Sequence, residues 1–221
     1  MSFLLDLPLF DRLRGSGVKT RLLHPHDEFW DRRLGIGTFG FIPAVGEPSN
    51  EAWQGHYQPT SYKDLFRMLR HVGIGADDVY VDLGCGLGRT VFVAHRMGAR
   101  RAVGVDVNGP LVRACRANLV RSGADPAAVQ FVEGFAQDQA HTDTTLLFLF
   151  HPFGRGTLKT VLDRLGEDLS AAPRRLRLIY FNAVSDDVLE GSGFLRQTDR
   201  WVAGKGWSPS TGDYDASFWT T

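Results

Sequence analysis

One stretch of the chain, residues 78–108, constrains the fold more than any other. It begins with a short run of β-favouring residues, 79–83, as expected for a strand buried on both faces of a parallel sheet. Three glycines follow, and residues 89–97 then have the length and apolar content of a packed helix. A second apolar run, 102–105, ends on Asp106. This order predicts a strand-turn-helix-strand unit of a nucleotide-binding α/β sheet, in which Asp106 would hold a ribose diol.

The spacing of the glycines separates two classes of cofactor. A dinucleotide fingerprint runs G-x-G-x-x-G and places a pyrophosphate on the helix N-terminus. Here the spacing is G-x-G-x-G, at Gly84, Gly86 and Gly88, and Asp82 stands two residues before the first glycine. A carboxylate at this position would repel a pyrophosphate but attract an ammonium group. The spacing therefore conflicts with a nicotinamide-dependent oxidoreductase, which stays as an alternative.

The turn and its carboxylate resemble the first motif of the class I S-adenosylmethionine (SAM) methyltransferases, here Asp82-Leu83-Gly84-Cys85-Gly86-Leu87-Gly88. The resemblance implies a Rossmann-like α/β fold with a doubly wound, seven-stranded, mostly parallel sheet. It also implies SAM as the cofactor, with Asp82 near the methionine amino group and Asp106 on the ribose hydroxyls. The cofactor-binding residues that we expect are Thr60, Asp82, Gly84, Cys85, Gly86, Gly88, Asp106, Val107 and Phe135.

Composition narrows the class of protein further. A chain of 221 residues is long enough for one α/β domain with an extension. Lysine plus arginine equals aspartate plus glutamate, at 25 each, so the overall charge argues against a nucleic-acid partner. No run approaches the ~20 apolar residues of a membrane span. With two cysteines and no basic leader, we expect a cytoplasmic protein without disulfides or a metal site.

The first part of the chain, residues 1–56, has no strong periodicity but is rich in aromatic residues. We expect an ordered N-terminal extension that serves as a lid, followed by the SAM-binding domain in residues 57–221. The run His24-Pro25-His26 is expected in a solvated loop, since no further histidine or cysteine cluster supports a metal site.

The segment Tyr57-Gln58-Pro59-Thr60 precedes an amphipathic helix that Thr60 or Ser61 would cap. From here to the glycine turn, the chain is similar to a bacterial branch of methyltransferases related in pattern to the non-SET histone-lysine methyltransferases. The similarity implies that this segment closes over the methionine end of SAM. The alternative, a helix-entry turn that Pro59 stiffens, stays open for Tyr57 and Thr60.

A third strand, 129–132, leads to Phe135, where many relatives have an acidic residue that accepts from the adenine amino group. Phe135 could instead stack on the adenine, with Gln137 or Asp138 as the acceptor. A phenylalanine of the core is the alternative.

The fourth strand, 146–150, ends in His151-Pro152-Phe153, which should lie beside the glycine turn. The tripeptide resembles a shortened Asn-Pro-Pro-Phe/Tyr motif of amino-group methyltransferases. The residues expected to act in catalysis are therefore His151, Phe153 and Tyr57, with His151 as a base because an imidazole pKa of about 6.5 suits proton removal near neutrality. The alternative is that His151 bonds to the backbone and that the two rings only pack.

Together these patterns predict a methyltransferase that moves a methyl group from SAM to an acceptor, with nitrogen favoured, on a small molecule or a protein. A non-catalytic SAM-binding subunit is a second alternative, because Phe135 and His151 depart from the family pattern. The last residues, 194–202 and 214–219, are expected to form the antiparallel pair that closes the sheet.

Overall fold

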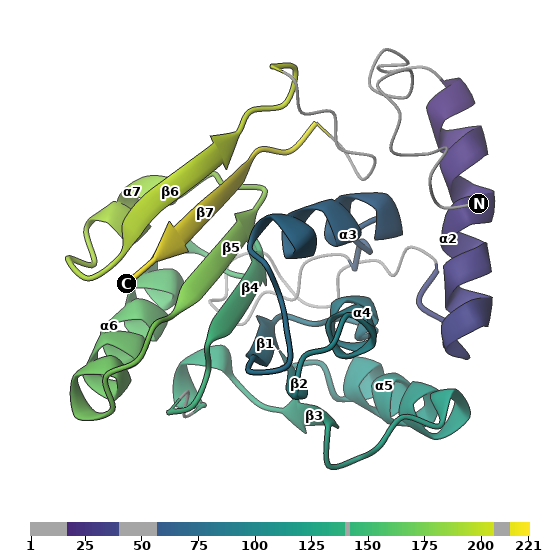
Figure 1. Ribbon diagram of the computed structural model, residues 1–221, viewed down its shortest axis with the longest axis horizontal. Coiled ribbons are helices and arrows are strands. Elements are labelled where there is room, and N and C mark those ends of the chain that lie inside the picture. The colour runs from purple at the N-terminus through teal and green to yellow at the C-terminus, as the bar shows by residue number, and fades with distance from the viewer. Residues whose placement is uncertain (1–16, 40–56, 140–141, 206–212) are drawn as a thin grey trace.

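The computed structural model describes residues 17–39, 57–139, 142–205 and 213–221, and its centre is a seven-stranded sheet (Figure 1). The strand order is β3-β2-β1-β4-β5-β7-β6. The strands are β1 (Val79–Leu83), β2 (Arg101–Asp106), β3 (Val129–Glu133), β4 (Leu146–Phe150), β5 (Arg177–Phe181), β6 (Arg196–Trp201) and β7 (Ala216–Thr220). Strands β1 to β5 pair in parallel, and β7 runs antiparallel between β5 and β6. The predicted doubly wound sheet and its antiparallel closing pair are confirmed.

Helices cover both faces of this sheet (Figure 1). Their bounds are α2 (Gly17–Leu34), α3 (Tyr62–His71), α4 (Arg89–Arg96), α5 (Gly109–Ser122), the 3-10 turn η2 (Ala136–Asp138), α6 (Arg155–Ala171) and α7 (Asp186–Glu190). Apolar residues of α3, α4 and α5 pack on one face, and those of α6 and α7 pack on the other. None of the helices in these described ranges is long and apolar enough to cross a membrane.

The strands at the centre of the sheet are buried on both faces. In β1, Tyr80 points into the layer under α3 and α4, whereas Val81 points into the layer under α6. In β4, Phe148 points into the layer under α3 and α4, and Leu147 points into the layer under α6. This two-sided burial explains why these strands are uninterrupted apolar runs and are visible in the sequence.

Polar side chains cap the N-termini of two of these helices. Ser61 caps α3 by accepting from the backbone N–H of Asp64 at 3.1 Å. Asn108 caps α5 by accepting from the backbone N–H of Leu111 at 3.3 Å, and Gly123, in the left-handed conformation, caps its C-terminus. Of the two caps proposed for α3, the structure selects Ser61, which leaves the hydroxyl of Thr60 available for another role.

The N-terminal part differs from its prediction. Residues 24–26 lie inside α2, so the expectation of a loop there was wrong; Pro25 is accommodated although it cannot donate a helical hydrogen bond. The helix docks through Trp30, whose ring packs against Tyr62 and Phe66 with centroid distances of 6.1 and 4.8 Å. The same helix also buries Asp27 and Asp31. Because its packed face is partly polar, the helix has no clear apolar periodicity.

Candidate cofactor and acceptor site

The glycine turn lies where the strand order reverses, between β1 and β4. Gly84, Gly86 and Gly88 have φ values of 84°, 56° and 81°, which favour glycine. The backbone N–H of Gly84 donates to Val105 of β2 at 2.8 Å. Ligands of open α/β sheets bind at such reversal points, beyond the carboxyl ends of the strands.

Asp106 ends β2 and is bonded to the glycine turn. Its Oδ2 accepts from the backbone N–H of Gly86 at 2.8 Å, and its Oδ1 accepts from Asn108 at 2.8 Å. Burial raises the pKa of this carboxyl above its ordinary value. Each oxygen keeps a second lone pair, so the half-buried carboxylate can also accept from a ligand hydroxyl.

Asp82 lies in β1 below the turn and is 3% exposed. It accepts a hydrogen bond from the hydroxyl of Thr90 in α4. Burial raises its pKa to about 7, and the nearby charge of Asp106 adds to the shift. Two carboxyl groups with raised pKa values thus share one site, and a bound cation would stabilise both in the ionised form.

Tyr57 lies against the glycine turn, and Thr60 follows it three residues later. The Tyr57 ring lies so close to Gly86 that a Cβ there would overlap with it, and its hydroxyl donates to the carbonyl of Thr38 at 2.8 Å. The hydroxyl of Thr60 is buried and has no hydrogen-bond partner among the described residues. A buried hydroxyl without a partner is destabilising, so Thr60 points to a missing polar ligand.

The remaining predicted cofactor residues occupy different environments. Phe135 follows Gly134, whose N–H donates to the carbonyl of Asp106 at 3.0 Å, and its ring is 46% exposed, so it is not a core residue. Cys85 is buried, and its Sγ packs against Gly104 of β2. Val107 is half-buried between Asp106 and the start of α5.

His151, which follows β4, is brought to the glycine turn by its neighbour. A Cβ on Gly84 would overlap with Pro152, so the His-Pro-Phe segment packs directly on the turn. His151 has a φ of 40°, a left-handed conformation that is uncommon for a residue with a side chain. Its Nδ1 lies 2.8 Å from the Tyr180 hydroxyl, and partial burial lowers its pKa. Phe153 is half-buried and packs on the layer under α6.

Several residues near the site were not predicted from the sequence. Tyr180 of β5 reaches His151, and Asn182 follows β5 with a φ of 56°, beside the end of β4. Arg89, the first residue of α4, is 2% exposed and pairs with Asp27 of α2. A spacing of four between Asp27 and Asp31 was a usable signal, because it places both carboxylates on one face of a helix.

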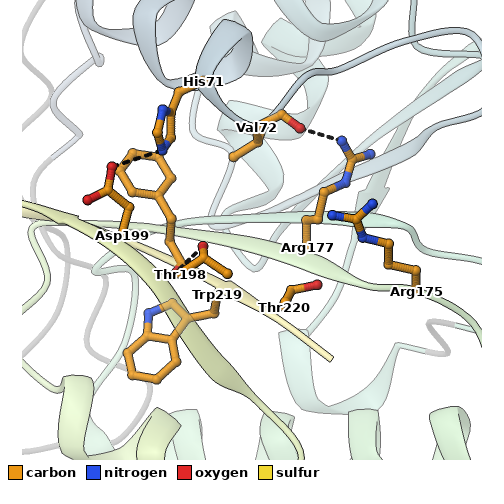
Figure 2. A pocket seen from close by; sticks show the side chains of 9 residues that line it. His71, Val72, Arg175, Arg177, Thr198, Asp199, Trp219 and Thr220 are labelled. Carbon is orange, nitrogen blue, oxygen red and sulfur yellow. Dashed lines mark hydrogen bonds and ion pairs between the residues drawn. The ribbon is translucent and has the colours of Figure 1, made fainter.

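A cavity of about 300 Å³ lies away from the glycine turn, at the amino end of β5 (Figure 2). Several of its polar groups are already engaged within the protein. His71 Nε2 lies 3.1 Å from Asp199, and Arg177 donates to the carbonyl of Val72 at 2.5 Å and pairs with Asp78. None of the predicted site residues lines this cavity, so it is separate from the site at the glycine turn.

The comparisons with known proteins agree with this geometry. Residues 81–169 match the family model described as a methyltransferase domain. The chain carries a class I methyltransferase domain. This domain is 34% identical over 96 residues to a protein-lysine N-methyltransferase of Saccharolobus islandicus (strain REY15A); the match covers 42% of this chain and 59% of that protein. The chain thus spans less than two thirds of that relative.

Solved structures share the fold of this chain. A SAM-dependent methyltransferase of Aquifex aeolicus is similar with a TM-score of 0.57 at 14% identity, covering 71% of this chain and 89% of that one. An RNA methyltransferase of Salinibacter ruber, solved with S-adenosyl-L-homocysteine (SAH), has a TM-score of 0.50 at 24% identity, covering 73% and 92%. The antiparallel β7 of this chain also differs from the parallel sheet of dinucleotide-binding folds, which the oxidoreductase alternative requires.

The residues of the methyltransferase domain fit SAM, the methyl donor that this class of fold implies. Asp106 has free lone pairs for ribose hydroxyls, and Phe135, which follows the residue bonded to the Asp106 carbonyl, has an exposed ring on which a base could stack. On the other side, Asp82 offers a carboxylate for a cation, and the hydroxyl of Thr60 lacks a partner among the described residues. When bound, SAM would supply an electrophilic methyl group on a sulfonium.

Proposed function

We propose that the protein transfers a methyl group from SAM to a nitrogen acceptor, and that the acceptor is a lysine side chain of a protein. The observation that carries the proposal is the contact between Pro152 and Gly84. This contact supports the proposal because His151, at the carboxyl end of β4, comes directly before Pro152, so an acceptor site at His151 would adjoin a donor site at the turn.

Methyl transfer is an in-line displacement in which the amine nitrogen forms a bond to carbon and the sulfur keeps the electron pair of the broken bond. The main task of the protein is to align the two partners, which can contribute roughly 7–11 kcal/mol in favourable cases. The amine must be neutral to attack, so a nearby group must accept its proton. His151, whose pKa is lowered by burial, is neutral at neutral pH and can accept a proton at one ring nitrogen.

A lysine acceptor is supported by the relative and by the surroundings of His151. The relative with 34% identity is a protein-lysine N-methyltransferase. In this chain, the rings of Phe150, Phe181 and Tyr214 cluster at the carboxyl ends of β4 and β5, with centroid distances of 4.6 to 5.6 Å. Aromatic faces favour an alkylammonium group and the methylated product alike. Val184, which is 60% exposed, follows the end of β5 by three residues and adds an apolar surface at that end of the sheet.

The test uses methyl-labelled SAM and a protein mixture in two forms, one native and one with its lysine side chains blocked by acetylation. The proposal predicts label in the native mixture, lost after blocking, and methylated lysines in the peptides by mass spectrometry. An Asp106→Ala variant is the control for contaminating enzymes. Equal labelling of both mixtures would overturn the lysine assignment, and label in added RNA instead of protein would overturn the protein acceptor.

A further inference from the structure

A buried ionic cluster joins α2 to the glycine turn. At its centre is Arg89, which directly follows Gly88 and is 2% exposed. Its Nη1 donates to Asp27 Oδ2 at 2.6 Å, and its Nη2 lies 3.7 Å from Asp31. The guanidinium also lies 4.5 Å from the ring centroid of Tyr62. A buried arginine is tolerated only when it is paired in this way, so the cluster fixes α2 on the domain.

Two links lead from this cluster to Tyr57, through Thr38. The Nε of Arg89 donates to the hydroxyl of Thr38 at 2.8 Å, and that hydroxyl donates to Asp31 at 2.6 Å. The backbone N–H of Thr38 also donates to Asp31 at 2.8 Å. Thr38 is thus held on three sides, and its carbonyl accepts from the Tyr57 hydroxyl at 2.8 Å. The position of the Tyr57 ring over Gly86 therefore depends on Arg89 and Asp31.

A further link leads directly to Thr60. The Nη1 of Arg89 donates to the carbonyl of Thr60 at 3.0 Å, which fixes the backbone at this residue. The hydroxyl of the same residue is the buried group without a partner among the described residues. Arg89 thus fixes the backbone of Thr60 directly and the hydroxyl of Tyr57 through Thr38.

The location of these residues decides which part of SAM they would face. Asp106 ends β2 and Phe135 follows β3, so the ribose and adenine would lie over that side of the sheet. The rest of the cofactor would then extend in the other direction, over β1 toward β4. Tyr57 lies over Gly86, in the turn that follows β1, and Thr60 is bonded to Arg89, the first residue of the helix after this turn.

We propose that Arg89, Asp27 and Asp31 are positioning residues for the methionine end of SAM. They act through Thr38, Tyr57 and Thr60, and they make α2 a functional part of the cofactor site. This inference rests on the proposed function only in taking SAM as the ligand. A role that is only structural would lower stability and leave the affinity for the cofactor unchanged.

The experiment compares two ligands by isothermal titration calorimetry: SAH, and 5′-methylthioadenosine, which lacks the amino-acid end. The variant is Thr38→Val, which keeps the shape of the side chain but removes the hydroxyl between Arg89 and Asp31. Asp31→Asn is a second variant that places an amide against the N–H and O–H donors of Thr38. Arg177→Met is the matched control, because Arg177 forms another shielded ion pair, with Asp78, at the amino end of β5 and away from the glycine turn.

The proposal predicts that Thr38→Val and Asp31→Asn weaken SAH binding by about tenfold, in the range found for residues that act through a network. Binding of methylthioadenosine should stay within about twofold, and Arg177→Met should lower the unfolding temperature without changing either affinity. Unchanged SAH affinity in folded variants would overturn the proposal, as would an equal loss for both ligands. A wild type that binds neither ligand would instead contradict the proposed function.

Discussion

The ring of Tyr57 lies directly against Gly86, in the space that a side chain at this position would need. Gly86 also has a φ of 56° and donates its N–H to Asp106 at 2.8 Å. Gly86 therefore contacts Tyr57, from the N-terminal part of the site, and also Asp106 at the end of β2. The absence of a side chain at Gly86 is required by this packing as well as by the turn.

A Gly86→Ala substitution should therefore damage the site more than the fold. The added methyl group would displace Tyr57 and the N–H that holds Asp106, so we expect SAH binding to weaken by more than about tenfold, equivalent to ~1.4 kcal/mol. Gly73→Ala is the matched control, since Gly73 also has a positive φ of 68° but nothing within 4 Å of a Cβ. Both variants should lose about 1 kcal/mol of stability through strain. Equal SAH affinity in the two variants, measured by calorimetry, would contradict this account of Gly86.

Binding of the cofactor should depend on pH through Asp82, because burial raises the pKa of this carboxyl to about 7. A ligand ammonium group favours the ionised carboxylate, so binding below pH 7 must release a proton, and SAH affinity should rise from pH 6 to pH 8. Calorimetry in buffers with different ionisation enthalpies measures the released proton. Methylthioadenosine, which lacks the ammonium group, should show no such release. SAH binding without proton release at pH 6 would show that the amino group does not meet Asp82.

The same group should make the free protein less stable at high pH. The pKa of Asp82 is about 7 in the folded state, above its ordinary value of 3.8, so its favourable contribution is complete below pH 3.8 and is lost as pH rises through 7. Asp82→Asn removes this dependence but keeps an acceptor for Thr90. We expect the variant to gain more unfolding free energy at pH 8 than at pH 5, by about 2–3 kcal/mol, in urea denaturation. A gain that is equal at both pH values would refute the assignment.

The rate of methyl transfer should fall in acid because of His151. Burial lowers the pKa of this imidazole below its ordinary 6.5, and the neutral form is the one that accepts a proton. His151→Ala should lower kcat by about a hundredfold and remove the acidic limb of the pH profile, with SAH affinity unchanged. Tyr180→Phe, which removes the hydroxyl 2.8 Å from Nδ1, should have a smaller effect on kcat. An acidic limb that persists in His151→Ala would assign it to another group.

The parts of the fold that the sequence predicted well are those set by neighbouring residues. The strand-turn-helix-strand unit from β1 to β2 follows from local apolar runs and glycines, and each signal lies within a few residues of the element that it sets. The approach of His151 to the glycine turn was also predictable, because the carboxyl ends of parallel strands meet at one edge of a sheet.

The parts that could not be predicted depend on polar contacts between distant residues. Arg89 and Asp27 are 62 positions apart, and His151 and Tyr180 are 29 apart. Such pairs have no periodicity, and a charged residue such as Asp31 is ordinarily expected on a solvated face. The spacing of Asp27 and Asp31 could indicate a helix face, but the contacts of this helix with Arg89 became visible only in the structure.

The most direct test of the central claim, that SAM binds at the glycine turn, is a calorimetric titration of the wild type and of Asp106→Ala with SAH and with NADH. The account predicts that the wild type binds one SAH per chain and no NADH, and that Asp106→Ala binds SAH at least about tenfold more weakly, since it loses a charge-assisted contact to the ribose. Binding of NADH to the wild type, or unchanged SAH binding in Asp106→Ala, would contradict it.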